Sequence, residues 1–105
     1  MDDPYAEQAV SIARSVLDGS TPIFLGCRQL SRPLIKLYVH DDEPFLRISA
    51  VAGKLYEFPT AEDRHLWNPG VVAKKEAELA AWLPEIRDGV LEACREIVRR
   101  FGEGG

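Results

Sequence analysis

The sequence predicts an α+β domain that is mainly helical: a helix, a kinked helix, a short β-hairpin and a long C-terminal helix. Three observations support this prediction. A capping residue is followed by proline at several places, apolar residues recur every three or four positions in the last third, and two short apolar runs flank a glycine. With 105 residues, 46% apolar and 29% charged, the chain has the composition of a single globular domain, residues 1–105.

The last third of the chain carries the strongest helix signal. Asn68 can cap a helix that begins at Pro69, because proline at the first helical position has no N–H to leave unpaired. Trp67 and Val72 have the spacing of a hydrophobic staple. One face of this helix is apolar and should pack on the two preceding helices: Leu79, Leu83, Ile86, Val90, Ala93, Ile97 and Phe101. Pro84 predicts a kink or a break in it.

The first helix should span about Pro4 to Asp18. Asp3 precedes Pro4 as an acidic cap, and Gly19 follows Asp18 where a helix commonly ends in a left-handed residue.

A second helix should follow the Ser20-Thr21-Pro22 start. Apolar residues at helical steps favour a helix, although Ile23–Leu25 alone has the pattern of a strand. Pro33 predicts a kink, or a restart near Ser31, because a regular helix would need its N–H.

The only strands that the sequence predicts form a β-hairpin. Phe45–Val51 alternates partly between apolar and polar residues, and Leu55–Phe58 alternates again after Gly53. A lone hairpin is marginal in water, so this one should cover one end of the helices. The preceding run His40–Pro44 is expected to be a polar turn.

Charge and hydropathy narrow the classes of partner. The net charge of −4 argues against a nucleic-acid partner and is compatible with a basic protein partner. No apolar run approaches the ~20 residues that cross a bilayer, and Met1-Asp2-Asp3 does not resemble a secretory signal. We therefore expect a cytoplasmic protein without membrane contact. Cys27 and Cys94 are expected to be buried thiols, although the sequence leaves a disulfide open.

Two short motifs resemble those of a family of small, uncharacterised bacterial proteins. They are Gly26-Cys27-Arg28-Gln29-Leu30, a Gly-x-Arg-x-Leu start to the second helix, and Leu66-Trp67-Asn68-Pro69, a Trp-x-Pro start to the long one. The resemblance covers most of the chain in the order of its elements, and it departs from the family at Val51–Lys54, where the family has a more acidic turn. It implies the fold described above and no particular activity.

Acidic residues concentrate in and beside the predicted hairpin: Asp41, Asp42, Glu43, Glu57, Glu62 and Asp63. If they converge, they form an edge that can attract a basic partner; otherwise they are ordinary solvated loop residues. Arg28 and Arg32 form a basic row with Lys36 that could bind an anionic group, or simply pair with neighbouring carboxylates. His40–Glu43 lacks the ligand spacing of a calcium loop or a zinc site, so we expect no metal and no cofactor.

The sequence favours a non-catalytic protein-interaction module, for instance an immunity-type or accessory protein that masks a basic partner. The chain is small, its acidic residues concentrate around the predicted hairpin, and it has no P-loop, Gly-x-Gly-x-x-Gly, His-Glu-x-x-His or Gly-x-Ser-x-Gly motif. The alternative is a small enzyme with Cys27 as nucleophile and His40 or His65 as its base. A homodimer is compatible with either function, and Tyr5, Phe24 and Trp82 are candidates for its interface.

Overall fold

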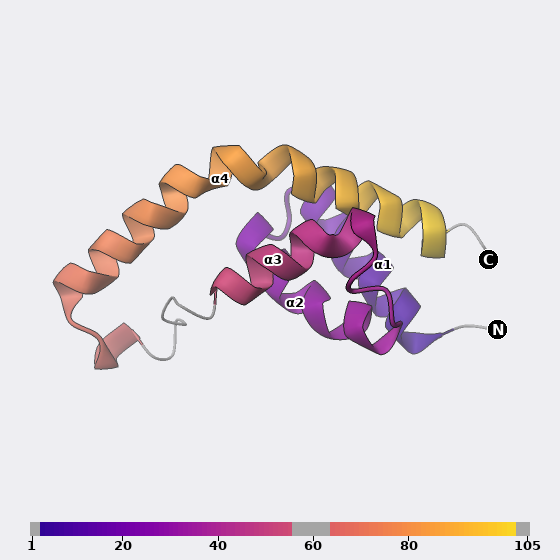
Figure 1. Ribbon diagram of the computed structural model, residues 1–105, viewed down its shortest axis with the longest axis horizontal. Helices are drawn as coiled ribbons and strands as arrows, with labels where there is room; N and C mark the ends of the chain where they lie inside the picture. The colour runs from indigo at the N-terminus through magenta and orange to yellow at the C-terminus, as the bar shows by residue number, and fades with distance from the viewer. Residues whose placement is uncertain (1–2, 56–63, 103–105) are drawn as a thin grey trace.

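Helices make up all the regular structure of residues 3–55 and 64–102, which are the residues that the computed structural model describes. In order, they are α1 (Pro4–Leu17), α2 (Ile23–Lys36), the 3₁₀ turn η1 (Glu43–Phe45), α3 (Leu46–Leu55), the 3₁₀ turn η2 (Arg64–Leu66), α4 (Pro69–Ile97) and the π-helical turn η3 (Val98–Gly102). Figure 1 shows α1, α2 and α3 packed beneath the C-terminal half of α4, while its N-terminal half extends beyond them. The molecule therefore measures 49 × 25 × 24 Å.

Helix α1 begins and ends as the sequence predicts. The carboxylate of Asp3 accepts a hydrogen bond from the N–H of Tyr5 at 2.8 Å, and Pro4 is the first helical residue. Gly19 follows the helix with a φ of 87°, a left-handed conformation that glycine adopts without a steric cost. The cap, proline and glycine together fix both ends of this helix.

Helix α2 is continuous, so the prediction of a restart near Ser31 is wrong. Residues Ile23–Leu25 are helical, and Pro33 lies inside the helix and is buried. Near its start, α2 approaches α1 so closely that a Cβ on Gly26 would overlap the side chain of Val16. Glycine at this position therefore allows the two helices to pack in direct contact.

The prediction of a β-hairpin, and with it the α+β class, is wrong. No strand occurs in the described ranges, and residues 46–55 form α3 instead. The buried residues Ile48, Val51 and Leu55 of α3 recur at helical steps, and Phe45 of the preceding η1 continues this spacing toward the core. Residues 56–58 of the second predicted strand lie outside the described residues. The described ranges are thus all-helical, and α3 packs into the core against α2 and α4 instead of covering one end of the helices.

Helix α4 runs for 29 residues without interruption. As predicted, the side chain of Asn68 caps it by accepting from the N–H of Gly70 at 2.8 Å, with Pro69 as the first helical residue. Pro84 lies inside the helix and removes one backbone hydrogen bond. Figure 1 shows the helix bending near its middle, so a kink is present and a break is not.

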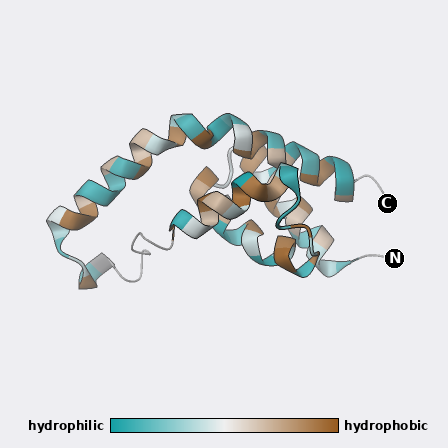
Figure 2. Cartoon of the chain, in the orientation of Figure 1, coloured by the Kyte–Doolittle hydropathy of each residue, from teal (hydrophilic) through white to brown (hydrophobic). Residues whose placement is uncertain are grey.

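The core forms between α1, α2, α3 and the C-terminal half of α4. This half supplies all the buried residues of α4: Val90, Ala93, Cys94 and Ile97. Leu83 and Ile86, which the sequence places on the same packing face, are only half-buried. Figure 2 shows hydrophilic residues along the outer side of this half, as expected of a helix that packs on a core.

Candidate interaction surface

The connection between α2 and α3 holds an aromatic residue in an unusual backbone conformation. Helix α2 ends in a Schellman motif, in which Tyr38 N–H donates to the carbonyl of Ile35 at 3.0 Å and Val39 N–H to that of Leu34 at 3.1 Å. This places Tyr38 at a φ of 61°, where glycine is the usual residue. The Tyr38 side chain is nevertheless 86% exposed, so packing within the protein does not explain why a tyrosine stands at this position.

Three of the predicted site residues follow in the same connection, which we call the acidic loop (residues 38–43). The carboxylate of Asp42 accepts a hydrogen bond from Arg100 at 3.1 Å, and the guanidinium of Arg100 lies 5.0 Å from the centre of the Phe45 ring. Asp41 and Glu43 are exposed and make no side-chain bond within the described residues. The hydrogen bond between Asp42 and Arg100 thus joins the loop to η3. The carboxylates of Asp41 and Glu43 are exposed to solvent, where a partner can contact them.

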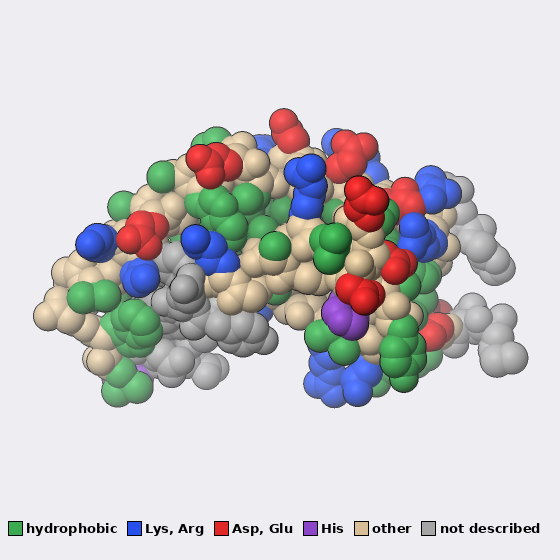
Figure 3. Space-filling model, viewed as in Figure 1, with side chains coloured by type: hydrophobic (Ala, Val, Ile, Leu, Met, Phe, Trp, Pro, Cys, Tyr) green, Lys and Arg blue, Asp and Glu red, His purple; other side chains and the backbone are tan. Residues whose placement is uncertain are grey.

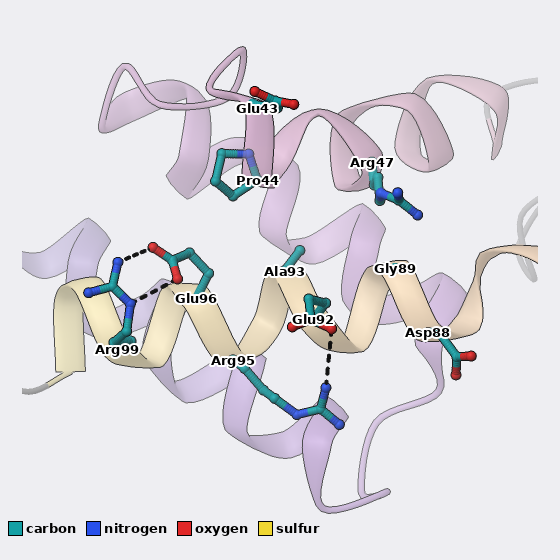
Figure 4. A pocket seen from close by; sticks show the side chains of 10 residues that line it. All are labelled: Glu43, Pro44, Arg47, Asp88, Gly89, Glu92, Ala93, Arg95, Glu96 and Arg99. Carbon is teal, nitrogen blue, oxygen red and sulfur yellow. Dashed lines mark hydrogen bonds and ion pairs between the residues drawn. The ribbon is translucent and has the colours of Figure 1, made fainter.

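A groove of about 770 Å³ continues from Glu43 along α4. Figure 4 shows Glu43 and Pro44 of η1 on one wall, Arg47 of α3 beside them, and the side chains of α4 on the other wall. Gly89 has no side chain and Ala93 has only a methyl group, and Arg47 lies directly over Gly89, where a Cβ would overlap its side chain.

The α4 wall of the groove carries pairs of opposite charge. Glu92 and Arg95 approach to 3.8 Å, and Arg99 donates to Glu96 through Nε at 2.9 Å. The hydrogen bond from Arg99 holds the pKa of Glu96 below its usual range. Figure 3 shows acidic and basic side chains crowded together over this end of the molecule. The surface is therefore strongly charged without being uniformly acidic.

The predicted basic residues lie in a different groove. Arg28 and Arg32 line a hollow of about 540 Å³ between α1 and α2, together with Gln8, Ser11, Ile12 and Gln29. Arg28 donates to the carbonyl of Leu55 at 3.0 Å and so caps the C-terminal end of α3. The remaining predicted acidic residues, Glu57, Glu62 and Asp63, lie outside the described residues. The structure therefore brings together Asp41, Asp42 and Glu43, and separates them from the arginines.

Both cysteines are free thiols in the core. Cys27 and Cys94 are fully buried, as the sequence predicts. Burial raises the pKa of Cys27 to about 12 and that of Cys94 to about 11. Of the two candidate bases, His65 is exposed on η2, whereas the Nδ1 of His40 is enclosed and has no hydrogen-bond partner among the described residues. A buried thiol with a raised pKa is a poor nucleophile at neutral pH.

No three His, Cys, Asp or Glu residues within 3–55 and 64–102 are grouped so as to hold a metal ion. None of the helices described has the length and apolar character needed to cross a bilayer.

Sequence reasoning did not identify Tyr38, Arg47 or Arg100 as part of this surface. Tyr38 follows the apolar residues of the second helix, and its left-handed backbone is evident only from the helix end in the structure. Arg100 meets Asp42 across 58 positions of sequence, a distance over which no local pattern exists. Of the three, Tyr38 alone had a local signal, because it immediately follows a helical stripe and precedes a polar turn.

Across residues 3–55 and 64–102, these features define a small helical protein with a strongly charged groove and an exposed tyrosine in a left-handed backbone conformation. No family model, no curated protein and no solved structure matches the chain. The resemblance to small bacterial proteins is therefore untested by these comparisons.

Proposed function

We propose that this protein is a non-catalytic interaction module that binds a basic protein partner through the acidic loop. An immunity-type or accessory protein is one form that such a module takes. The proposal extends the predicted acidic site by adding Tyr38 to Asp41, Asp42 and Glu43.

The observation that carries this proposal is the conformation of Tyr38. A residue with a Cβ in the left-handed region costs about 1–2 kcal/mol relative to glycine. Strained residues that the surrounding structure holds in place, as the helix-ending hydrogen bonds hold Tyr38, cluster at functional sites. Tyrosine is also among the residues enriched at protein interfaces, since it offers a large apolar face and a hydrogen-bonding tip. An 86% exposed Tyr38 fits that role better than a structural one.

The charges around Tyr38 indicate the chemistry of the partner. Asp41 and Glu43 lie within five residues of Tyr38, and neither forms a side-chain bond inside the described ranges. Carboxylates at an exposed rim speed the encounter with a partner of opposite charge and add specificity. Asp42 contributes differently, because its bond to Arg100 at 3.1 Å restrains the loop that presents the other residues.

The thiol geometry argues against the enzymatic alternative. A catalytic Cys27 would need access to substrate and a lowered pKa. Cys27 has no exposed surface, and its pKa is about 12. The interaction module therefore accounts for more of the structure than a Cys27 enzyme does.

The test is capture from the native lysate with the tagged wild-type protein and two loop variants, identified by mass spectrometry. Tyr38→Gly should raise the free energy of unfolding by about 1 kcal/mol, because glycine relieves the left-handed backbone. The same variant should lose the partner. A residue with a purely structural role could not produce a more stable protein that binds less.

The second variant, Asp41→Asn with Glu43→Gln, removes two charges and keeps the shape of the side chains. It should weaken capture and reduce the sensitivity of binding to salt. Glu7→Gln with Glu85→Gln is the matched control, since both residues are exposed and lie outside the loop and the groove. A partner that both loop variants retain as well as this control would contradict the proposal.

A further inference from the structure

A second groove lies between the α1–α2 turn and the middle of α4. It encloses about 400 Å³, and its walls are mainly apolar: Val16, Leu17, Pro22, Ile23, Phe24, Leu83 and Leu91. Phe24 also stacks on Trp82, with ring centres 5.8 Å apart, at the edge of the same region. Apolar surface of this kind is favourable to remove from water.

This apolar groove is separate from the charged groove, because the two use opposite sides of α4. At 100° per residue, Leu83, Arg87 and Leu91 share one side of the helix. Gly89 and Ala93, in the charged groove, point roughly 80–160° away from them. A partner in one groove therefore leaves the other accessible.

The apolar groove carries one charge of each sign. Asp18 and Arg87 both line it and both are exposed. Hydrogen bonding from the side chain of Ser20, and then from its N–H at 2.8 Å, lowers the pKa of Asp18, so its carboxylate is ionised at neutral pH. Arg87 has no side-chain partner within the described parts of the chain. One acid and one base on an apolar surface are self-complementary under a two-fold axis.

From these observations we infer that the apolar groove is the interface of a two-fold homodimer. Leu83, Leu91 and Ile23 of one copy pack on the same residues of the second copy, and each Asp18 pairs with Arg87 of the other. This inference concerns a different surface from the acidic loop and does not rest on the proposed function.

The molar mass in solution, measured by analytical ultracentrifugation over a range of protein concentrations, tests the inference. The wild-type protein should sediment with twice the mass of the chain. Arg87→Asp and Asp18→Arg should each raise the dimer dissociation constant by roughly tenfold or more, because each creates two pairs of like charges across the axis. The double variant should recover the wild-type constant, since the exchanged charges again pair.

Arg32→Asp is the matched control, because it makes the same charge change in the other groove between α1 and α2 and should leave the dimer intact. Circular dichroism on every variant separates dissociation from unfolding. Leu83→Glu gives a second route, since Leu83 is only half-buried and an acidic residue there should dissociate the dimer without unfolding the monomer. A wild-type monomer at every concentration, or a dimer indifferent to both charge reversals, would overturn the inference.

Discussion

The two halves of α4 have the same secondary structure and very different surroundings. Every buried residue of the helix lies at or beyond Val90, whereas the residues from Pro69 to Ala81 are exposed or half-buried. Val71 is 43% exposed and Val90 is 1% exposed, although both are valines on one continuous helix. We call residues 69–81 the arm and residues 85–97 the packed half.

The comparison shows that a helix can be stabilised in two ways within one element. Tertiary contacts hold the packed half, as in most protein helices. Among the described residues, the interactions of the arm are mainly local: the Asn68 cap, Pro69 at the first position, and a surface pair between Lys75 and Glu78 at 3.9 Å. Trp82 joins the two regions, since it stacks on Phe24 and lies 5.3 Å from the ammonium of Lys54.

The largest expected difference between the halves is in thiol reactivity. A cysteine introduced by Ala77→Cys lies on the exposed side of the arm, whereas the native Cys94 is fully buried and has a raised pKa. Alkylation of Cys94 in the folded protein needs opening of the core, which costs ~5 kcal/mol or more. The introduced thiol should therefore react roughly a thousandfold faster or more.

Peptide mapping by mass spectrometry after timed alkylation gives both rates in the same sample. Cys27 serves as the internal control and should react as slowly as Cys94, because it is equally buried. Rapid modification of Cys27 in the folded protein would instead support the alternative in which Cys27 is a catalytic nucleophile.

The next largest expected difference is in the free energy of unfolding that is lost when a valine in each half is replaced by alanine. Val90→Ala should lower the free energy of unfolding by about 2 kcal/mol, because it leaves a cavity in the core. Val71→Ala should change it by less than about 0.5 kcal/mol, because solvent already surrounds much of that side chain. Urea denaturation of the two variants checks the contrast. Similar losses would mean that the arm packs on other residues and is not free.

The smallest expected difference is between two helix caps. Asp3 and Asn68 each accept a hydrogen bond at 2.8 Å from the second residue of a helix. Asp3→Ala should lower the free energy of unfolding by about 1 kcal/mol. Asn68→Ala should lower it by less than half as much, because the first turn of the arm can open without unfolding the core.

Thermal and urea unfolding give the two free energies, and amide hydrogen exchange in the first turn of α4 should report the local loss in Asn68→Ala. Equal global losses in the two variants would show that the arm and the core unfold as one unit.

The sequence predicted those parts of the fold that depend on local chemistry. The caps at Asp3 and Asn68, the glycine after α1 and the bend at Pro84 each arise from residues within a few positions of one another. The buried thiols were also predicted, since small apolar residues in a helical stripe usually face the core.

The hairpin prediction failed because two periodicities overlap in the same segment. β-Branched residues and a partial alternation around Ile48 and Val51 favour a strand, and Gly53 has the character of a turn residue. The buried positions Phe45, Ile48, Val51 and Leu55, however, are spaced by three, three and four. Burial of these side chains in the core favours the helical spacing. The intrinsic β-preference of single residues does not decide between helix and strand in this segment.

The candidate site was predicted in part for similar reasons. Asp41, Asp42 and Glu43 were identified because they are consecutive in sequence. The bond of Asp42 to Arg100, and that of Arg28 to the end of α3, depend on helix packing and leave no local signal.

The contact between α1 and α2 has a consequence for how relatives of this chain can be recognised. A Cβ on residue 26 would overlap the side chain of Val16, so any larger residue at position 26 requires a smaller one at position 16. The two positions should therefore co-vary during evolution. A distant homologue with alanine at position 26 is expected to carry alanine or glycine at position 16, and this reciprocal pair is a signature that a sequence search can use.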